Sequence, residues 1–195
     1  MGLRAGTEER ILDAAEDLFF TRGISATPID AVIARAGVSA ATLYRGFASK
    51  EALLAAALER RQAAWIDVWD DAIARHDDPV EQLLAVFDAL ERFRDKPQGS
   101  RWCAFLGSAA EYADAPAEVA AAVRADTDAM RSRLRRLAAP VASARAEELA
   151  EQLLLVVTGD LAMRLREPGR ESGAESSRGT ADARAIAALL VAAAR

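Results

Sequence analysis

Two short helical patterns separated by one glycine lie within residues 27–45, TPIDAVIARAGVSAATLYR. Gly37 can adopt the positive φ that ends a helix, and the hydroxyl of Ser39 is a typical cap for the helix that follows. We therefore expect one helix over residues 28–36, a tight turn, and a second helix over residues 39–45.

A longer amphipathic helix is predicted before this pair, over residues 7–22, because apolar residues recur at i, i+3, i+4, i+7 and i+8 from Ile11. A helix followed by two short helices around a glycine turn is the helix-turn-helix arrangement, whose last helix lies in the major groove of DNA. The same pattern also fits a packed helical corner without DNA. The pattern alone does not decide between these alternatives.

The remaining sequence continues in helical patterns and contains no stretch that alternates with the period of two typical of strands. Further helices are expected over residues 49–76, 79–94, 102–112, 116–138, 144–166 and 180–194, with a Gly/Ser-rich linker over residues 168–179. The predicted fold class is all-α, with about nine helices.

Residues 7–54 resemble the N-terminal domain of the TetR family of transcriptional regulators. The matching positions are Arg10-Ile-Leu-Asp-Ala-Ala-Glu-Asp-Leu-Phe19, Gly23, Thr27, Ile33, Ala36-Gly-Val-Ser39, Leu43-Tyr44, Phe47 and Lys50-Glu-Ala-Leu53. One departure is Gly46, where this family usually has His or Tyr before the Phe.

The resemblance implies a homodimer with two recognition helices that bind double-stranded operator DNA, and a divergent C-terminal domain that binds a small effector. The predicted domains are a three-helix helix-turn-helix DNA-binding domain over residues 1–50 and a larger helical effector-binding and dimerisation domain over residues 51–195.

The exposed face of the second short helix supplies the candidate DNA contacts. Hydroxyl groups can reach phosphates or bases, alanines let the backbone approach, and Arg45 can pair with a guanine edge or a phosphate. By position, Tyr44 and Lys50 match the residues with which the TetR family usually contacts phosphate. The full predicted set is Thr27, Ser39, Ala40, Ala41, Thr42, Tyr44, Arg45 and Lys50.

The charge distribution permits DNA binding although the net charge is −5. Residues 1–62 carry equal numbers of acidic and basic side chains, so the whole excess of negative charge lies in the rest of the chain. A neutral module on an acidic body can bind DNA if its basic groups share one face.

Enzyme, metal-binding and membrane functions are not expected. Cys103 is the only cysteine and His76 the only histidine, so we expect neither an internal disulfide nor a metal site built from these residue types. No phosphate-binding glycine loop or nucleophile elbow occurs, and we predict no catalytic residues, no cofactor and no metal. The longest apolar run, residues 153–157, is far shorter than the roughly 20 residues of a membrane span. Without an apolar secretion signal, a cytoplasmic protein is expected.

Aromatic side chains are concentrated between residues 65 and 112. Two interpretations stay open: the aromatic side chains fill an ordinary core, or some of them line a cavity for a small molecule. Residues 102–106 with Glu111 also look like a motif of one branch of the family. The predicted pocket set is Trp65, Trp69, Phe87, Trp102, Cys103, Phe105, Leu106, Glu111, Tyr112 and Met130. Because this wall contains no Lys, we expect an apolar or weakly polar effector that releases a repressor from its operator.

The expected helix over residues 144–166 is apolar on more than one side between Leu149 and Leu161, and the last helix has a long Ala/Leu/Ile stripe. One helix can bury two apolar sides only between its own core and a partner. We therefore predict a twofold-symmetric four-helix interface made by these two helices of each subunit.

Overall fold

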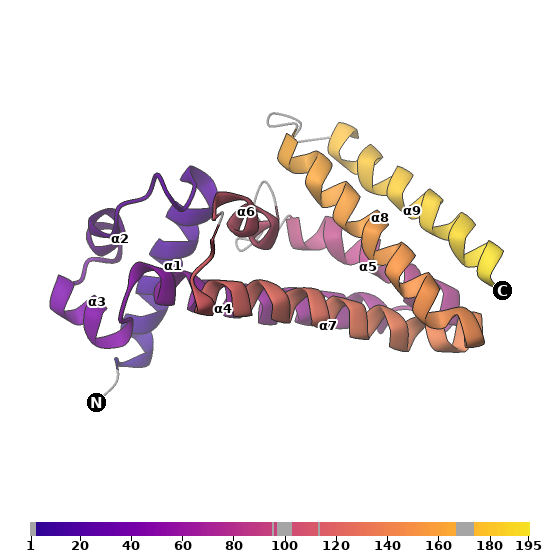
Figure 1. Ribbon diagram of the computed structural model, residues 1–195, viewed down its shortest axis with the longest axis horizontal. Helices are drawn as coiled ribbons and strands as arrows, with labels where there is room; N and C mark the ends of the chain where they lie inside the picture. Colours follow the sequence, from indigo (N-terminus) through magenta and orange to yellow (C-terminus); the bar gives the residue numbers. More distant parts are fainter. Residues whose placement is uncertain (1–2, 95, 97–102, 113, 167–173) are drawn as a thin grey trace. The chain divides into compact units, whose positions relative to one another are not determined.

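The structure is a computed structural model that describes residues 3–94, 96, 103–112, 114–166 and 174–195, with the backbone alone at 174–178. Its elements are α1 (Ala5–Arg22), α2 (Ile29–Ala36), α3 (Ala40–Gly46), α4 (Lys50–Ile73), α5 (Pro79–Arg94), α6 (Ala104–Glu111), α7 (Ala117–Ala142), the short 3-10 helix η1 (Ser143–Arg145), α8 (Ala146–Arg166) and α9 (Ala174–Ala194) (Figure 1). Every regular element in these ranges is helical, so the predicted all-α fold is confirmed. None of the described helices is both long and apolar enough to cross a membrane.

Two compact units make up the chain. The first comprises residues 1–62 and 104–124, and the second comprises residues 63–103 and 125–195. The helices α4 and α7 therefore each contribute their first part to the first unit and their second part to the second unit, whereas α6 belongs to the first unit. The functional boundary expected after residue 50 is a different partition and stays a prediction.

The helix α1 supplies a large part of the apolar core of the first unit. Ile11 and Phe19 lie on its inner face and are at most 1% exposed, and burial of each such side chain stabilises the unit by roughly 1.5–3 kcal/mol. The helix begins at Ala5 rather than at Thr7, because the last extended residue before it is Arg4, with φ −73° and ψ 141°. The helix predicted over residues 7–22 therefore begins two residues earlier than expected.

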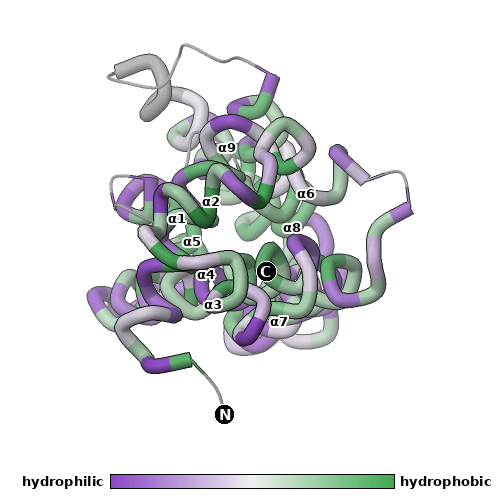
Figure 2. The backbone as a smooth tube through the Cα atoms, turned by 90° about the vertical axis from the view of Figure 1, so that its left-hand side faces the viewer, coloured by the Kyte–Doolittle hydropathy of each residue, from purple (hydrophilic) through white to green (hydrophobic). Residues whose placement is uncertain are grey.

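The helix α5 runs through the core of the second unit, where residues 83–87 are all at most 2% exposed. The helices α8 and α9 pack against each other, and α9 also packs against α5. Figure 2 shows hydrophobic and hydrophilic stretches along the backbone of the described helices, and the buried apolar residues of α5, α8 and α9 lie in the core of the second unit.

In α7 and α9, too, one end of the helix differs from the sequence prediction. The helix α7 continues through Pro140 to Ala142, because a proline so near the end of a helix removes few backbone hydrogen bonds. The helix α9 begins at Ala174 rather than at Thr180. Ser and Gly are only ~0.5–1 kcal/mol less favourable than Ala in a helix, so they do not stop a long packed helix from extending. The rest of the predicted linker, residues 168–173, lies outside the described residues.

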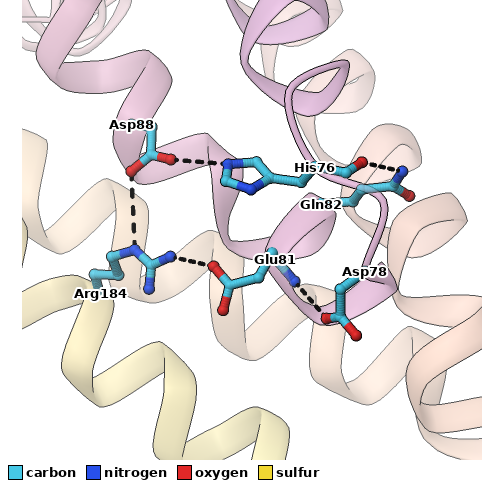
Figure 3. A network of polar contacts seen from close by, with 6 residues as sticks. All are labelled: His76, Asp78, Glu81, Gln82, Asp88 and Arg184. Atoms are coloured by element: carbon cyan, nitrogen blue, oxygen red, sulfur yellow. Dashed lines mark hydrogen bonds and ion pairs between the residues drawn. The ribbon is translucent and has the colours of Figure 1, made fainter.

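A polar network joins the turn after α4 to α5 and α9 in the second unit (Figure 3). The Nε2 atom of His76 lies 3.3 Å from Oδ2 of Asp88. Arg184 on α9 lies 2.6 Å from Oε2 of Glu81 and 3.8 Å from Oδ1 of Asp88. The Oδ1 atom of Asp78 accepts hydrogen bonds from the first backbone N–H groups of α5 at 2.9 and 3.1 Å and so caps that helix. The network holds α9 against the helix on which it packs.

Candidate nucleic-acid interface

The turn between α2 and α3 forms as the sequence predicts. Gly37 adopts the left-handed conformation, with φ 63° and ψ 41°, which glycine tolerates without strain. The N–H groups of Gly37 and Val38 donate to carbonyls in the last turn of α2, both at 3.3 Å. Leu43 is fully buried and anchors α3 to the core of the first unit. The predicted helix-turn-helix geometry is present.

Ser39 caps α3, as expected. Its Oγ atom accepts a hydrogen bond from the N–H of Thr42 at 3.1 Å and lies 2.8 Å from the hydroxyl oxygen of the same residue. Both hydroxyl groups therefore have partners within α3. Their contact with DNA stays a prediction.

The outer face of α3 carries the remaining predicted contacts. Ala40, Ala41, Tyr44 and Arg45 are all exposed, and the exposed fraction of Tyr44 is 49%. Among the residues that the structure describes, Arg45 forms no hydrogen bond or ion pair. This face combines two small side chains, a phenol and an unengaged guanidinium group, which suits close approach to a DNA groove.

Gly46, the departure from the family pattern, ends α3 beneath Leu3. A Cβ atom at position 46 would overlap the side chain of Leu3. The N-terminal segment therefore occupies the space that the usual His or Tyr would need.

Thr27 does not reach the surface. It is 1% exposed, and its hydroxyl donates to the carbonyl of Gly23 at 2.7 Å and to that of Leu18 at 3.2 Å. The residue before α2 with extended backbone is Pro28, and no side chain caps that helix. Thr27 holds the turn that leads into α2 through its hydroxyl, and its contact with DNA stays a prediction.

Lys50, the predicted phosphate contact, is half-buried at the start of α4. Its Nζ atom donates to the carbonyl of Ile24 at 2.5 Å and lies 5.8 Å from the ring centroid of Phe19. An ammonium group has three donors, so this bond leaves donors for a phosphate, and the DNA contact stays a prediction. The bond to Ile24 was not foreseen, because nothing in the sequence pairs residues 24 and 50.

Glu111 holds the turn after α1, and its predicted contact with an effector stays a prediction. Its two carboxylate oxygens accept hydrogen bonds from the N–H groups of Ile24 at 3.0 Å and Ser25 at 2.7 Å. The neighbouring Tyr112 has its pKa raised by burial and, further, by the negative charges of Glu51 and Glu111. The carboxylate of Glu111 therefore acts inside the first unit.

The rest of the predicted pocket wall is divided between the two units. Phe105, Leu106, Glu111 and Tyr112 belong to the first unit, whereas Trp65, Trp69, Phe87, Cys103 and Met130 belong to the second. Trp102 lies outside the described residues. Trp69 and Phe87 are at most 1% exposed in the core of the second unit, which favours a core role for these two side chains.

An aromatic cluster surrounds Trp65 in the second unit. Its ring centroid lies 5.5 Å from that of Trp69 and 5.6 Å from that of Phe93, the latter in an edge-on arrangement. The Nε1 donor of Trp69 is buried without a hydrogen-bond partner among the described residues. Sequence reasoning missed Phe93 because a single aromatic residue near a helix end has no distinctive spacing.

Asp126 is a second residue that sequence reasoning missed. It is 8% exposed on α7, and burial raises its pKa to about 7. Among the described residues it forms no hydrogen bond or ion pair. Asp126 lies four residues after Ala122 and four before Met130 on the buried stripe of α7. This helical spacing from apolar residues was the sequence feature that could have predicted its burial. No group of three or more His, Cys, Asp or Glu side chains in the described part of the chain could hold a metal ion.

Large apolar side chains are exposed on α8 and α9. Leu155 and Leu189 are each 72% exposed, and Ile186 and Met163 are about half exposed, at 52% and 49%. On the other side of α8, Leu153 is fully buried in the core of its own unit. The helix α8 therefore presents apolar residues both to its own core and to the outside.

Comparisons with known proteins agree with this architecture. Residues 11–57 match the family model described as bacterial regulatory proteins, tetR family. An uncharacterized HTH-type transcriptional regulator of Mycobacterium tuberculosis (strain CDC 1551 / Oshkosh) is 38% identical over 95 residues, which are 48% of this chain and 47% of that protein. The HTH-type transcriptional activator FasR of Mycolicibacterium smegmatis is 30% identical over 132 residues, which are 66% of this chain and 60% of that protein.

The chain thus matches about half of the length of the first relative and three fifths of the second. The crystal structure of a TetR-family transcriptional regulator from Streptomyces coelicolor superposes with a TM-score of 0.84 at 24% identity, over 98% of this chain and 97% of that chain. The matched N-terminal residues and the shared fold lead to one assignment: residues 11–57 match the TetR family of bacterial regulatory proteins, and the described helices have the fold of a TetR-family regulator.

Proposed function

We propose that this protein is a transcriptional repressor that binds double-stranded operator DNA through α3 and leaves it when a small effector binds. The observation that carries the proposal is the outer face of α3. Tyr44 and Arg45 are exposed there beside two alanines, on a helix fixed by the Gly37 turn and by buried Leu43. A packed helical corner without DNA would not require an exposed, unengaged guanidinium group on α3.

The proposal includes a homodimer formed through α8 and α9. Exposed Leu155, Ile186 and Leu189 support it, because apolar side chains of this size gain stability when a second copy covers them. A twofold dimer presents two copies of α3, and binding of successive major grooves requires a separation of about 34–36 Å. No catalytic step is part of the proposal, and operator binding would take place in the cytoplasm.

The proposed effector is apolar or weakly polar. Trp65 and Phe93, whose ring centroids lie 5.6 Å apart, support an apolar contact surface. Repression is proposed over activation because an effector that disturbs the spacing of two recognition helices removes the protein from DNA. The relative named as an activator, FasR, makes activation the second candidate, and transcription in vitro with and without the protein distinguishes the two.

The proposal is tested by a gel shift with the DNA that flanks the protein's own gene, at several salt concentrations. The Arg45→Ala variant should bind about 5- to 150-fold more weakly, equivalent to ~1–3 kcal/mol, and should lose preference at one base position. The matched control is Arg136→Ala, which removes the same charge from an exposed position of α7. Equal affinities of the wild type and both variants would contradict the assignment of α3 as the recognition helix.

A further inference from the structure

The backbone of Ile24 is held on both sides by charged side chains. Its N–H donates to Oε1 of Glu111 at 3.0 Å, and the next N–H, of Ser25, donates to Oε2 at 2.7 Å. On the other side, the carbonyl of Ile24 accepts a hydrogen bond from Nζ of Lys50 at 2.5 Å. A carboxylate on the N–H side and an ammonium group on the carbonyl side together form a clamp, which we define by Glu111, Lys50 and the turn 23–25.

The clamped turn leads directly into the helix-turn-helix. Gly23 has φ 93° and ends α1, and the side chain of Ile24 is 2% exposed. The carbonyl of Ile24 also accepts a hydrogen bond from the N–H of Thr27 at 3.2 Å, and α2 begins two residues later, at Ile29. The turn therefore determines where α2 starts. Because the tight turn at Gly37 joins α2 to α3, the position of α2 also determines the position of α3.

Glu111 connects this turn to α6, an element far away in the sequence. One side of α6 is buried in the first unit: Phe105 is 8% exposed and Ser108 is 0% exposed. Glu111 is the last residue of the helix, so a small rotation or shift of α6 would move its carboxylate away from both N–H groups. Hydrogen bonds to a carboxylate are worth more than neutral ones but depend steeply on distance.

We propose that Glu111 is a positioning residue for operator binding, through which α6 fixes the turn that precedes the helix-turn-helix. The inference rests on the proposed function and adds a route for its regulation. Phe105 and Leu106, predicted to contact the effector, are on the same short helix as Glu111. An effector that displaces α6 releases the turn and thereby lowers the affinity of α3 for DNA.

The experiment compares the wild type with Glu111→Gln and Glu111→Ala. Glutamine keeps the shape but replaces one acceptor oxygen by a donor, and alanine removes both acceptors without adding a donor. The matched control is Asp114→Asn, which neutralises an exposed acid shortly after α6. Two readouts are measured: the hydrogen exchange of the Ile24 and Ser25 amides by NMR without DNA, and operator affinity with its salt dependence.

Loss of two hydrogen bonds to a carboxylate should speed exchange of both amides and weaken operator binding, each by about tenfold. The slope of affinity against salt should not change, because no phosphate contact is removed. Unchanged amide exchange in both Glu111 variants would overturn the clamp itself, whether or not DNA binds. Faster exchange with unchanged operator affinity would show that the clamp is only structural and would overturn the positioning role. If the wild type binds no operator while the amides respond, the proposed function fails, and the positioning role for operator binding fails with it.

Discussion

Replacing Asp126 with Asn tests whether a buried carboxyl group limits the stability of this protein. Burial raises the pKa of Asp126 from an ordinary 3.8 to about 7. Because its pKa is higher in the folded state than in the unfolded state, the folded protein binds the additional proton between about pH 4 and pH 7. The contribution of Asp126 to stability is therefore fully present below that window and is lost as the pH rises through it.

The size of the effect follows from the two pKa values. A difference of about three units at 1.36 kcal/mol per unit corresponds to roughly 4 kcal/mol lost between pH 4 and pH 8. Asparagine has nearly the same shape and carries no charge, so Asp126→Asn should match the wild type near pH 4 and be more stable at pH 8 by up to that amount. Denaturant unfolding at a fixed protein concentration, at several pH values from 5 to 8, measures the difference between the two proteins.

The matched control for this experiment is Asp128→Asn on the same helix. Asp128 is exposed and pairs with Arg131, and exposed ion pairs contribute only about 0–1 kcal/mol. The free energy of unfolding of the control, relative to the wild type, should be nearly independent of pH over the same range. A stability difference between wild type and Asp126→Asn that does not change from pH 5 to pH 8 would refute the reasoning.

Two further predictions concern assembly and the first unit. Leu189→Arg, at a position 72% exposed, should yield a folded monomer that no longer binds the operator, as measured by light scattering and gel shift. Ala139→Arg, at an exposed position of α7, is its control, and a dimeric Leu189→Arg protein would rule out the α8–α9 interface. Thr27→Val keeps the shape of Thr27 but removes the donor to Gly23 and Leu18, and should lower the free energy of unfolding by ~1–3 kcal/mol. The control Thr21→Val, at an exposed position, should change it far less, and equal losses at both positions would contradict the structural role of Thr27.

Features set by neighbouring residues were predictable from the sequence. The turn at Gly37 and the Ser39 cap of α3 depend on interactions within a few residues, and short-range patterns record such interactions directly. The burial of Thr27 was not predictable in this way, because a hydroxyl side chain before a helix can either stay exposed or bury its hydroxyl against carbonyls. Which of the two occurs depends on how α1 and the following turn pack.

Long-range contacts were not predictable from local patterns. Glu111 binds a turn that precedes it by 86 and 87 residues, and a single exposed-looking acid at a helix end gives no sign of such a partner. Leu153 and Leu155 are both apolar and close in sequence, yet one is fully buried and the other is 72% exposed. Which side of α8 faces its own core depends on how α8 packs against α9. The spacing of apolar residues on α8 alone does not give this information.

The assignment of α6 to the first unit changes how a signal from an effector could reach the DNA. A boundary at residue 50 would make α4 the only continuous connection between DNA binding and effector binding. In the structure the chain passes between the units after residues 62, 103 and 124, and the first and third passages lie inside α4 and α7. A continuous helix resists bending, whereas hydrogen bonds at a helix end break with small displacements. The clamp at Glu111 is therefore the part of the first unit that should respond first when α6 moves, and the amide exchange of Ile24 and Ser25 should change before that of the amides within α3.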